Sequence, residues 1–337
     1  MATELIGVAG LTTQLALRQF ERRLLSRFRT ENVFNRWATK AKIDKRMGKS
    51  ISFRKMEVIW PTGSAATWGA QASAGLNLLT EGTPPAFTNA TWSQVLATVS
   101  QYGQASLISD LAEDQSIDDI VPEWTENYSE SMRDCLDLVA RDVLMAGSTV
   151  QFASTAGSRA LIGSGMYLSL AELREAKRTL KTLNARPIRS EGGKFVVVTS
   201  PAAVFDLEGD TNITNVFTYG GGGVGAGANQ LFDVTFKDLP LGFRLFESNL
   251  VRVFASAGLS GADVIGTLVL GEEAYGAIDL ASAPPRIIRK ERGSSGAIGD
   301  PLDQVASVGW KACYAAVRLQ ENAMVRLEHA SSSKNAA

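Results

Sequence analysis

The sequence has few of the residues on which enzyme active sites and metal sites are built. It contains two cysteines, Cys135 and Cys313, whose separation matches no metal-binding spacing, and a single histidine, His329, near the C-terminus. The sequence therefore offers few residues for a Ser-His or Cys-His nucleophile pair, or for a histidine-based zinc site. We interpret the cysteines as small buried hydrophobic residues in a reducing cytoplasm.

Long apolar runs and an excess of charge are also missing. Apolar runs such as Phe195–Val198 and Val264–Leu270 are far shorter than the roughly 20 residues that a membrane-spanning helix needs. The 337 residues carry a net charge of −1, so the overall charge implies no polyelectrolyte partner. The length suffices for one large domain or two modest ones, each with a hydrophobic core.

Charge is instead divided along the chain. Residues 18–55 contain 13 lysines and arginines against three acids, whereas residues 106–142 contain 11 acids against two bases. A near-neutral chain with two oppositely charged regions can pair head to tail with copies of itself. Two solvated surfaces, or a basic arm folded back on its own body, would explain the same pattern.

The basic region begins with an amphipathic helix predicted over Leu11–Leu25, because apolar residues recur there at near-helical spacing. Phe28, Phe34 and Trp37 are interleaved with lysines and arginines, which would allow stacking on nucleic-acid bases. No recognised nucleic-acid motif is present. Sequence-independent contact with nucleic acid and contact with an acidic neighbouring subunit both remain open.

Two strands and a long helix follow the basic region. Alternating sequences predict strands over Ile51–Ile59 and Trp92–Tyr102. The 30 or so residues between them are too poor in core residues to pack on themselves, which predicts a projecting hairpin that needs an outside surface. Apolar residues at steps of three and four predict a helix over Asp118–Ala146, roughly 42 Å long, with acids at its start and Gly147 at its end.

An α/β unit is predicted over residues 166–260. Its helix, Leu168–Leu183, begins with a capping box formed by Ser169 and Glu172. A buried strand over Lys194–Thr199 precedes a short helix opened by Ser200 and Pro201. Further strands are predicted at Phe232–Phe236, Phe243–Glu247, Val264–Leu270, Ala283–Arg289 and Ala306–Ala330.

Two features could carry chemistry. Gly220, Gly222 and Gly225 satisfy the G-x-G-x-x-G pattern of dinucleotide sites, but no helical apolar stripe follows them to hold a pyrophosphate. We therefore interpret residues 220–227 as a glycine-rich tip of the α/β unit. Acid pairs such as Asp118 and Asp119 could bind a cation or act as acid and base. Acids are favoured at a helix start in any case, so we interpret the pairs as structural.

The amino-acid sequence of several segments resembles that of the major capsid proteins of tailed bacteriophages, in particular the N-four-like podophage branch. The resemblance rests on short matches that occur in the family's order between about Leu11 and Glu328: Ala97–Gly103, Ser109–Leu111, Leu136–Leu138, Arg141–Asp142, Leu144–Gly147, Leu173–Arg174, Arg178–Lys181, Asn184–Pro187, Leu241–Arg244, Glu247–Ser248, Gly271, Ala274–Gly276, Asp300–Leu302 and Gly309–Lys311. Residues 220–227 are richer in glycine than the family pattern at that place.

The resemblance implies an α+β fold known as the Johnson or Hong Kong ninety-seven fold. Its expected parts are an N-terminal arm (1–49), an E-loop (50–104), a first part of the P-domain with the spine helix (105–165), an A-domain (166–261), and P-domain return strands with a C-terminal tail (262–337). The implied function is structural: pentamers and hexamers of an icosahedral virion shell around double-stranded DNA, assembled in the bacterial cytoplasm. No catalytic residue, cofactor or metal is implied. Scaffold, portal and decoration proteins are further expected partners, and a membrane is not.

If copies of the chain associate, the fit must come mainly from apolar anchors, since surface ion pairs contribute only about 0–1 kcal/mol each. The candidate inter-subunit contacts are Phe20, Phe34, Trp37, Trp68, Arg22, Arg36, Asp118 and Asp119. Three alternatives stay open: an encapsulin-like nanocompartment shell protein, a dinucleotide-dependent enzyme resting on the glycine tract, and a basic-armed DNA-binding protein.

Overall fold

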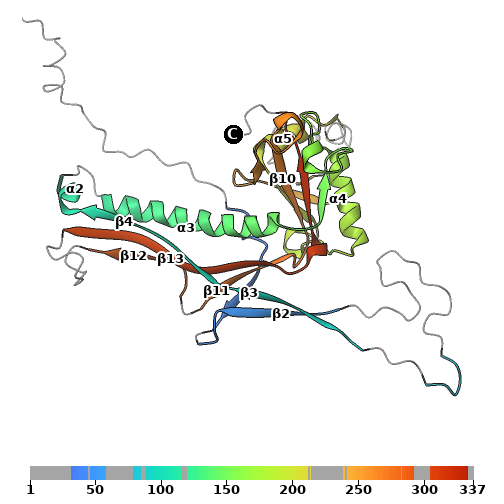
Figure 1. The fold of residues 1–337 in the computed structure, drawn as a ribbon, viewed down its shortest axis with the longest axis horizontal. Coiled ribbons are helices and arrows are strands. Elements are labelled where there is room, and N and C mark those ends of the chain that lie inside the picture. The colour runs from blue at the N-terminus through green and yellow to red at the C-terminus, as the bar shows by residue number, and fades with distance from the viewer. Residues whose placement is uncertain are drawn as a thin grey trace, which may run out of the picture.

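A computed structural model gives the fold of most of the chain (Figure 1). The described residues are 32–44, 46–57, 79–84, 89–115, 120–211, 213, 238–239, 241–281, 283–291 and 304–332. The predicted Leu11–Leu25 helix, the Phe232–Phe236 strand and the glycine tract lie outside them.

A five-stranded sheet is organised around one long strand, β13 (Val305–Arg318). On one side β13 pairs antiparallel with β4 (Ser100–Ser109) along ten residues. On its other side it pairs antiparallel with β12 (Arg286–Lys290) and then with β11 (Tyr275–Leu280). A parallel strand, β1 (Thr39–Ile43), extends the sheet beyond β11. The strand that orders this sheet therefore comes from the last fifth of the sequence.

The predicted long helix is confirmed as α3 (Ile120–Met145), which lies along this sheet (Figure 1). Trp124, Tyr128 and Met132, spaced one turn apart, pack against alternate residues of β13. Those residues of β13 are Ala306, Val308, Trp310 and Ala312. The 3.6-residue period of the helix thus meets the two-residue period of the strand along one apolar seam. A short helix, α2 (Asp110–Gln115), precedes α3.

A second sheet has seven strands and forms the other half of the body. Its central strands, β6 (Phe195–Thr199) and β10 (Val264–Leu270), are buried along their whole length. The sheet order is β5-β14-β10-β6-β8-β7, with β9 pairing to β10. The remaining strands are β5 (Val150–Phe152), β7 (Asp238–Leu239), β8 (Phe243–Glu247), β9 (Val253–Phe254) and β14 (Met324–His329).

The return segment expected over residues 262–337 is divided between the two sheets. Strands β11, β12 and β13 lie beside α3, whereas β10 and β14 pair with each other in the seven-stranded sheet, where β10 also pairs with β6. The α/β unit therefore takes its central strand from beyond its expected boundary at residue 261. Strand pairing joins residues distant in the sequence, so a boundary drawn along the chain does not capture it.

Two helices accompany the second sheet. The helix α4 (Leu170–Thr182) begins as predicted, because the Ser169 side chain accepts a hydrogen bond from the Glu172 amide. The Glu172 carboxylate does not complete the capping box: it accepts from the backbone amide of Ser154 at 2.9 Å and from Gln151 at 3.3 Å. The helix α5 (Pro201–Glu208) is capped by Ser200, as predicted. Short 3-10 turns occur at Arg159–Leu161, Arg189–Glu191, Leu259–Gly261 and Glu321–Ala323.

A two-stranded hairpin, β2 (Ser50–Met56) with β3 (Trp92–Thr98), runs outward from the five-stranded sheet (Figure 1). Its inner face packs through Ile51, Phe53 and Ala97 against Ile278 and Ala315. The second strand was predicted to continue to Tyr102; instead β3 ends at Thr98, and β4 begins at Ser100 in the other sheet.

A buried polar chain crosses the seven-stranded sheet. The hydroxyls of Thr199 and Thr267 lie 2.6 Å apart, and the Thr267 hydroxyl lies 2.8 Å from Nε2 of His329. The other ring nitrogen, Nδ1, lies 2.7 Å from the carbonyl oxygen of Ala330, so Nδ1 carries the proton and Nε2 accepts. Burial lowers the pKa of His329 to about 4, which keeps the ring neutral at physiological pH.

This arrangement predicts an acid-sensitive contribution to stability. The unfolded state binds a proton on His329 below about pH 6.5, whereas the folded state binds it only below about 4. Stability is therefore present above pH 6.5 and is lost as pH falls toward 4, by about 3 kcal/mol in all. We expect His329→Gln, which cannot titrate, to flatten this part of the pH dependence. Urea unfolding of both proteins at pH 7, 5 and 4 measures it, and parallel profiles would contradict the assignment.

Candidate assembly surfaces

The chain enters the described body through a tight turn anchored on α3. Asp137, fully buried on that helix, accepts hydrogen bonds from the backbone amides of Val33 at 3.1 Å and Asn35 at 2.9 Å. Burial raises the pKa of Asp137, and the backbone amides at residues 33–35 oppose that shift. The hydroxyl of Tyr275 donates to the carbonyl of Phe34, and that of Tyr314 donates to the Asn35 side chain. The turn is thus held by groups from α3, β11 and β13.

A second buried acid, Glu191, ties the same turn to the seven-stranded sheet. Its carboxylate accepts a hydrogen bond from Nε1 of Trp37 at 2.8 Å and pairs with Arg244 at 3.0 Å and Arg36 at 3.5 Å. The Trp37 ring packs edge-on against Phe246, with 4.6 Å between the ring centroids. The Cζ atom of Arg36 lies 4.9 Å from the centroid of the same phenylalanine ring. Two acids, Asp137 and Glu191, therefore fix the place where the N-terminal segment joins both halves of the body.

Three of the residues expected to contact a neighbouring subunit make contacts within their own subunit. Phe34 is fully buried in the core of its own chain, and Trp37 packs beside that core. Arg36 is half-exposed and already paired with Glu191. Phe34 therefore anchors the N-terminal segment to its own subunit, since a side chain without exposed surface offers none to a neighbour. Trp37 and Arg36 also bond within the subunit but keep exposed surface, so their contact with a neighbour stays a prediction. Five other candidates lie outside the described residues: Phe20, Arg22, Trp68, Asp118 and Asp119.

The roles of Asp137 and Glu191 were not anticipated from the sequence. Asp137 is one of the acids of residues 106–142, and its charge alone does not distinguish it from Asp134. Its partners are more than 100 residues away in the chain. The available signal was its place: Asp137 lies between Leu136 and Leu138 in a helix of apolar periodicity, where a buried acid demands hydrogen-bond donors.

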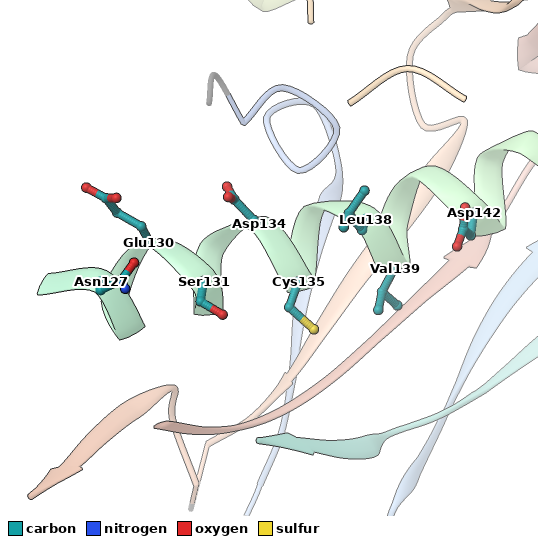
Figure 2. Close-up of a pocket in the computed structure, with 8 residues that line it drawn as sticks. All are labelled: Asn127, Glu130, Ser131, Asp134, Cys135, Leu138, Val139 and Asp142. Atoms are coloured by element: carbon teal, nitrogen blue, oxygen red, sulfur yellow. The ribbon is translucent and has the colours of Figure 1, made fainter. Parts of the chain in front are cut away.

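A groove of about 480 Å³ runs along the flank of α3 (Figure 2). Its lining combines acids, small polar groups and apolar side chains. Figure 2 shows Glu130, Asp134 and Leu138 pointing to one side of the helix, and Cys135 and Val139 pointing toward the strands. The remaining lining residues are Asn127, Ser131 and Asp142. The groove offers negative charge beside apolar surface, which suits a basic amphipathic segment.

The outer face of the β2–β3 hairpin carries large apolar side chains that are exposed. Trp92 and Met56 are directly opposite each other in the ladder, and Leu96 follows on the same face. Trp92 is 67% exposed and Leu96 65%. Large apolar side chains gathered on one face of a projecting element are typical of a protein–protein contact.

The described part of the chain offers little for a metal site, a membrane-spanning helix or a reactive cysteine. Within it, His, Cys, Asp and Glu side chains form no group of three or more that could hold a metal ion. None of its helices is long and apolar enough to cross a membrane. Cys135 and Cys313 are unpaired thiols, and burial raises the pKa of Cys135, which disfavours its reactive thiolate.

Comparison with known proteins places these surfaces in context. A family model described as phage capsid protein matches residues 92–326. No curated protein matches the chain.

Several solved phage capsids resemble the structure along nearly its whole length. For the capsid of Ralstonia phage GP4 the identity is 11% and the TM-score 0.69, covering 99% of this chain and 100% of that one. For the cyanophage Pam1 capsid the identity is 12% and the TM-score 0.65, covering 99% of this chain and 100% of that one. For the cyanophage P-SCSP1u capsid the identity is 16% and the TM-score 0.64, covering 95% of this chain and 94% of that one. At these identities the likeness concerns the fold, and it confirms the α+β tailed-phage capsid fold.

The position of Phe34 predicts a folding defect. Removing its side chain leaves a cavity in the core, which typically costs about 3–5 kcal/mol. We expect Phe34→Ala to lower the free energy of unfolding by about this amount. Phe205→Ala, at a site 65% exposed on α5, should change it by less than about 0.5 kcal/mol. Urea unfolding of the three proteins at neutral pH makes the comparison, and equal midpoints would contradict the burial of Phe34.

The hydrogen bonds of Asp137 predict a local opening. In Asp137→Asn the charge is lost and an NH₂ group replaces one of the two acceptor oxygens, so one backbone amide loses its partner. We expect hydrogen exchange at Val33 or Asn35 to accelerate by about tenfold, since about 1.4 kcal/mol corresponds to that factor. Asp134→Asn, less than one turn away, is the matched control and should leave both amides unchanged. Slow exchange in both variants would refute the anchor.

Proposed function

The chain belongs to the phage capsid protein family, and we propose that it assembles into pentamers and hexamers. The chain is a major capsid protein that forms an icosahedral shell, and the shell is the virion capsid. Double-stranded DNA is the cargo we propose for this shell, with assembly in the host cytoplasm. The N-four-like podophage branch is the subfamily that we propose from the sequence resemblance.

The exposed apolar face of the β2–β3 hairpin is the observation that best supports self-assembly. The hairpin is anchored on its own sheet by Ile51, Phe53 and Ala97, so its direction is set within the subunit. Its outer face, with Trp92 and Leu96, remains exposed in the single chain. An aromatic anchor on a projecting and pre-positioned element reaches a neighbour with little loss of conformational entropy.

The α3 groove supports a second contact. The basic region of residues 18–55 and the acidic region of residues 106–142 have opposite charges. Leu138 and Val139 add apolar surface to the lining of the groove. We propose that the basic N-terminal segment of one copy lies along α3 of the next. Each exposed ion pair contributes about 0–1 kcal/mol, so repetition by symmetry must supply the rest.

The rival functions have less support. The family match does not favour an encapsulin-like nanocompartment. A dinucleotide-dependent enzyme would rest on the glycine tract, which lies outside the described residues. We propose that the chain has no catalytic role, with non-specific DNA contact, scaffold, portal and decoration proteins as further interactions.

The direct test is to produce the full chain in bacteria and separate the product by size-exclusion chromatography before electron microscopy. We expect closed shells, or rings of five and six subunits. Nucleic acid inside purified shells would support the phage cargo, whereas a protein cargo would favour the nanocompartment. A stable monomer at high protein concentration, alone and with the products of neighbouring genes, would count against the proposal.

The hairpin contact makes a sharper prediction. We expect Trp92→Ala to leave subunit stability within about 0.5 kcal/mol, because the ring is largely exposed. Particle yield should fall by about tenfold or more, since an aromatic hot spot contributes about 2 kcal/mol or more per contact. Phe205→Ala removes an equally exposed aromatic ring from α5 and serves as control. If both variants assemble like the wild type, the hairpin face is not an anchor.

A further inference from the structure

Within the described residues the chain passes three times between the two halves of the body, the five-stranded sheet with α3 and the seven-stranded sheet (Figure 1). The first crossing, residues 146–149, leads from α3 to β5, and the second, residues 271–274, leads from β10 to β11. The third crossing, residues 319–323, leads from β13 to β14. The angle between the two halves therefore depends on how these short segments are held together.

Backbone hydrogen bonds join the second crossing to the third. The amide of Gly271 donates to the carbonyl of Ala323 at 2.7 Å, and the amide of Leu319 donates to the carbonyl of Ala274 at 2.9 Å. A Cβ atom on Gly271 would lie 3.1 Å from the carbonyl oxygen of Ala323 and 2.8 Å from that of Arg186. A side chain there would push the backbones apart. These two crossings therefore form one unit with a closely packed backbone.

The side chain of Glu321 joins the first crossing to this unit. One carboxylate oxygen, Oε1, accepts hydrogen bonds from the backbone amide of Ser148 and, at 3.1 Å, from its hydroxyl. The other oxygen, Oε2, pairs with Arg318 at 3.2 Å. Arg318 also donates at 3.4 Å to the carbonyl of Val143, in the last turn of α3. Glu321 therefore connects the end of α3 to the turn between β13 and β14.

The end of α3 depends on groups from elsewhere in the chain. The last carbonyls of a helix have no partner within the helix and attract cations, yet the last turn of α3 contains no basic residue. Arg318, at the end of β13, and Arg326, on β14, supply donors to carbonyls in that turn. Removing Arg326 would also leave the buried Glu328 with one cation fewer. The side chain of Glu321 is 29% exposed, so its removal disturbs the core less.

The angle between the two halves matters for a closed shell. Contacts at distant parts of a subunit set the rotation from one copy to the next, and this rotation decides whether repetition closes and after how many copies. A small change of angle inside the subunit recurs at every contact. The curvature of the whole shell therefore changes with the angle between the halves.

We propose that Glu321 is a positioning residue that fixes the angle between the two halves of the subunit and thereby the size of the closed shell. Its carboxylate holds the end of α3 against the turn after β13, and without it the angle takes a wider range of values. This inference rests on the proposed shell function and names one determinant of shell size.

Substitution of Glu321 in the full-length chain tests the inference. We expect Glu321→Ala to fold and to raise the fraction of open sheets and shells of abnormal diameter about tenfold, because hydrogen bonds to a charged group shift the ratio of two conformations by at least that factor. Electron microscopy of purified particles measures the diameters. Glu272→Ala is the matched control: Glu272 lies in the second crossing, is 26% exposed and pairs with Arg189 at 3.3 Å. Its shells should keep the wild-type diameter.

A second substitution tests whether Glu321 acts through Arg318. We expect Arg318→Met to broaden the diameters as Glu321→Ala does, and the double variant to broaden them little further, since both residues belong to one link. Fully additive broadening would contradict the link. If Glu321→Ala does not fold, Glu321→Gln takes its place: it keeps an acceptor for Ser148, loses the ion pair with Arg318, and should broaden the diameters to a smaller extent.

The size of the particles separates this inference from the proposed function. Shell formation by the wild-type chain tests the function, and the variants are compared only with wild-type diameters. A residue needed for stability alone would lower the yield without changing the size of the particles that form. Shells of wild-type diameter from the folded Glu321 variant would overturn the inference. Folded subunits that no longer associate would overturn it too, because Glu321 would then control association rather than curvature.

Discussion

The packing of α3 on β13 is the constraint on which the rest of the structure depends. One apolar seam, with Trp124, Tyr128 and Met132 on the helix side, fixes a long helix parallel to a long strand. Every other strand of that sheet except β1 takes its position directly from β13. The hairpin packs on Ala315 of β13, and the N-terminal turn is bound by Asp137 of α3, so both are positioned by the two elements that form this seam. A shell subunit needs such a reference, because its contacts at distant ends must keep a constant spacing.

Buried ion pairs carry this rigidity from α3 into the seven-stranded sheet. Glu328 on β14 has no exposed surface and pairs with Arg159 at 2.6 Å and with Arg326 at 2.8 Å. The Arg326 guanidinium also donates to the carbonyl of Met145, the last residue of α3. A carboxylate in this position is stable only while both cations stay in place. The end of α3 and strand β14 of the seven-stranded sheet are therefore held in one relative orientation.

Local patterns in the sequence predicted individual elements well, because their causes are local. The period of α3, the Ser169 and Ser200 caps and the largely apolar strand β10 each follow from residues within a few positions of one another. Interactions across the chain were not predicted. Phe34 and Trp37 lie among lysines and arginines, which left open whether this region contacts nucleic acid, a neighbouring subunit or its own body. Asp137 and Glu191, 100 or more residues away, hold Phe34 in the core of its own subunit and Trp37 beside it. Glu172 likewise satisfies Ser154 rather than its own cap, a choice made by tertiary structure.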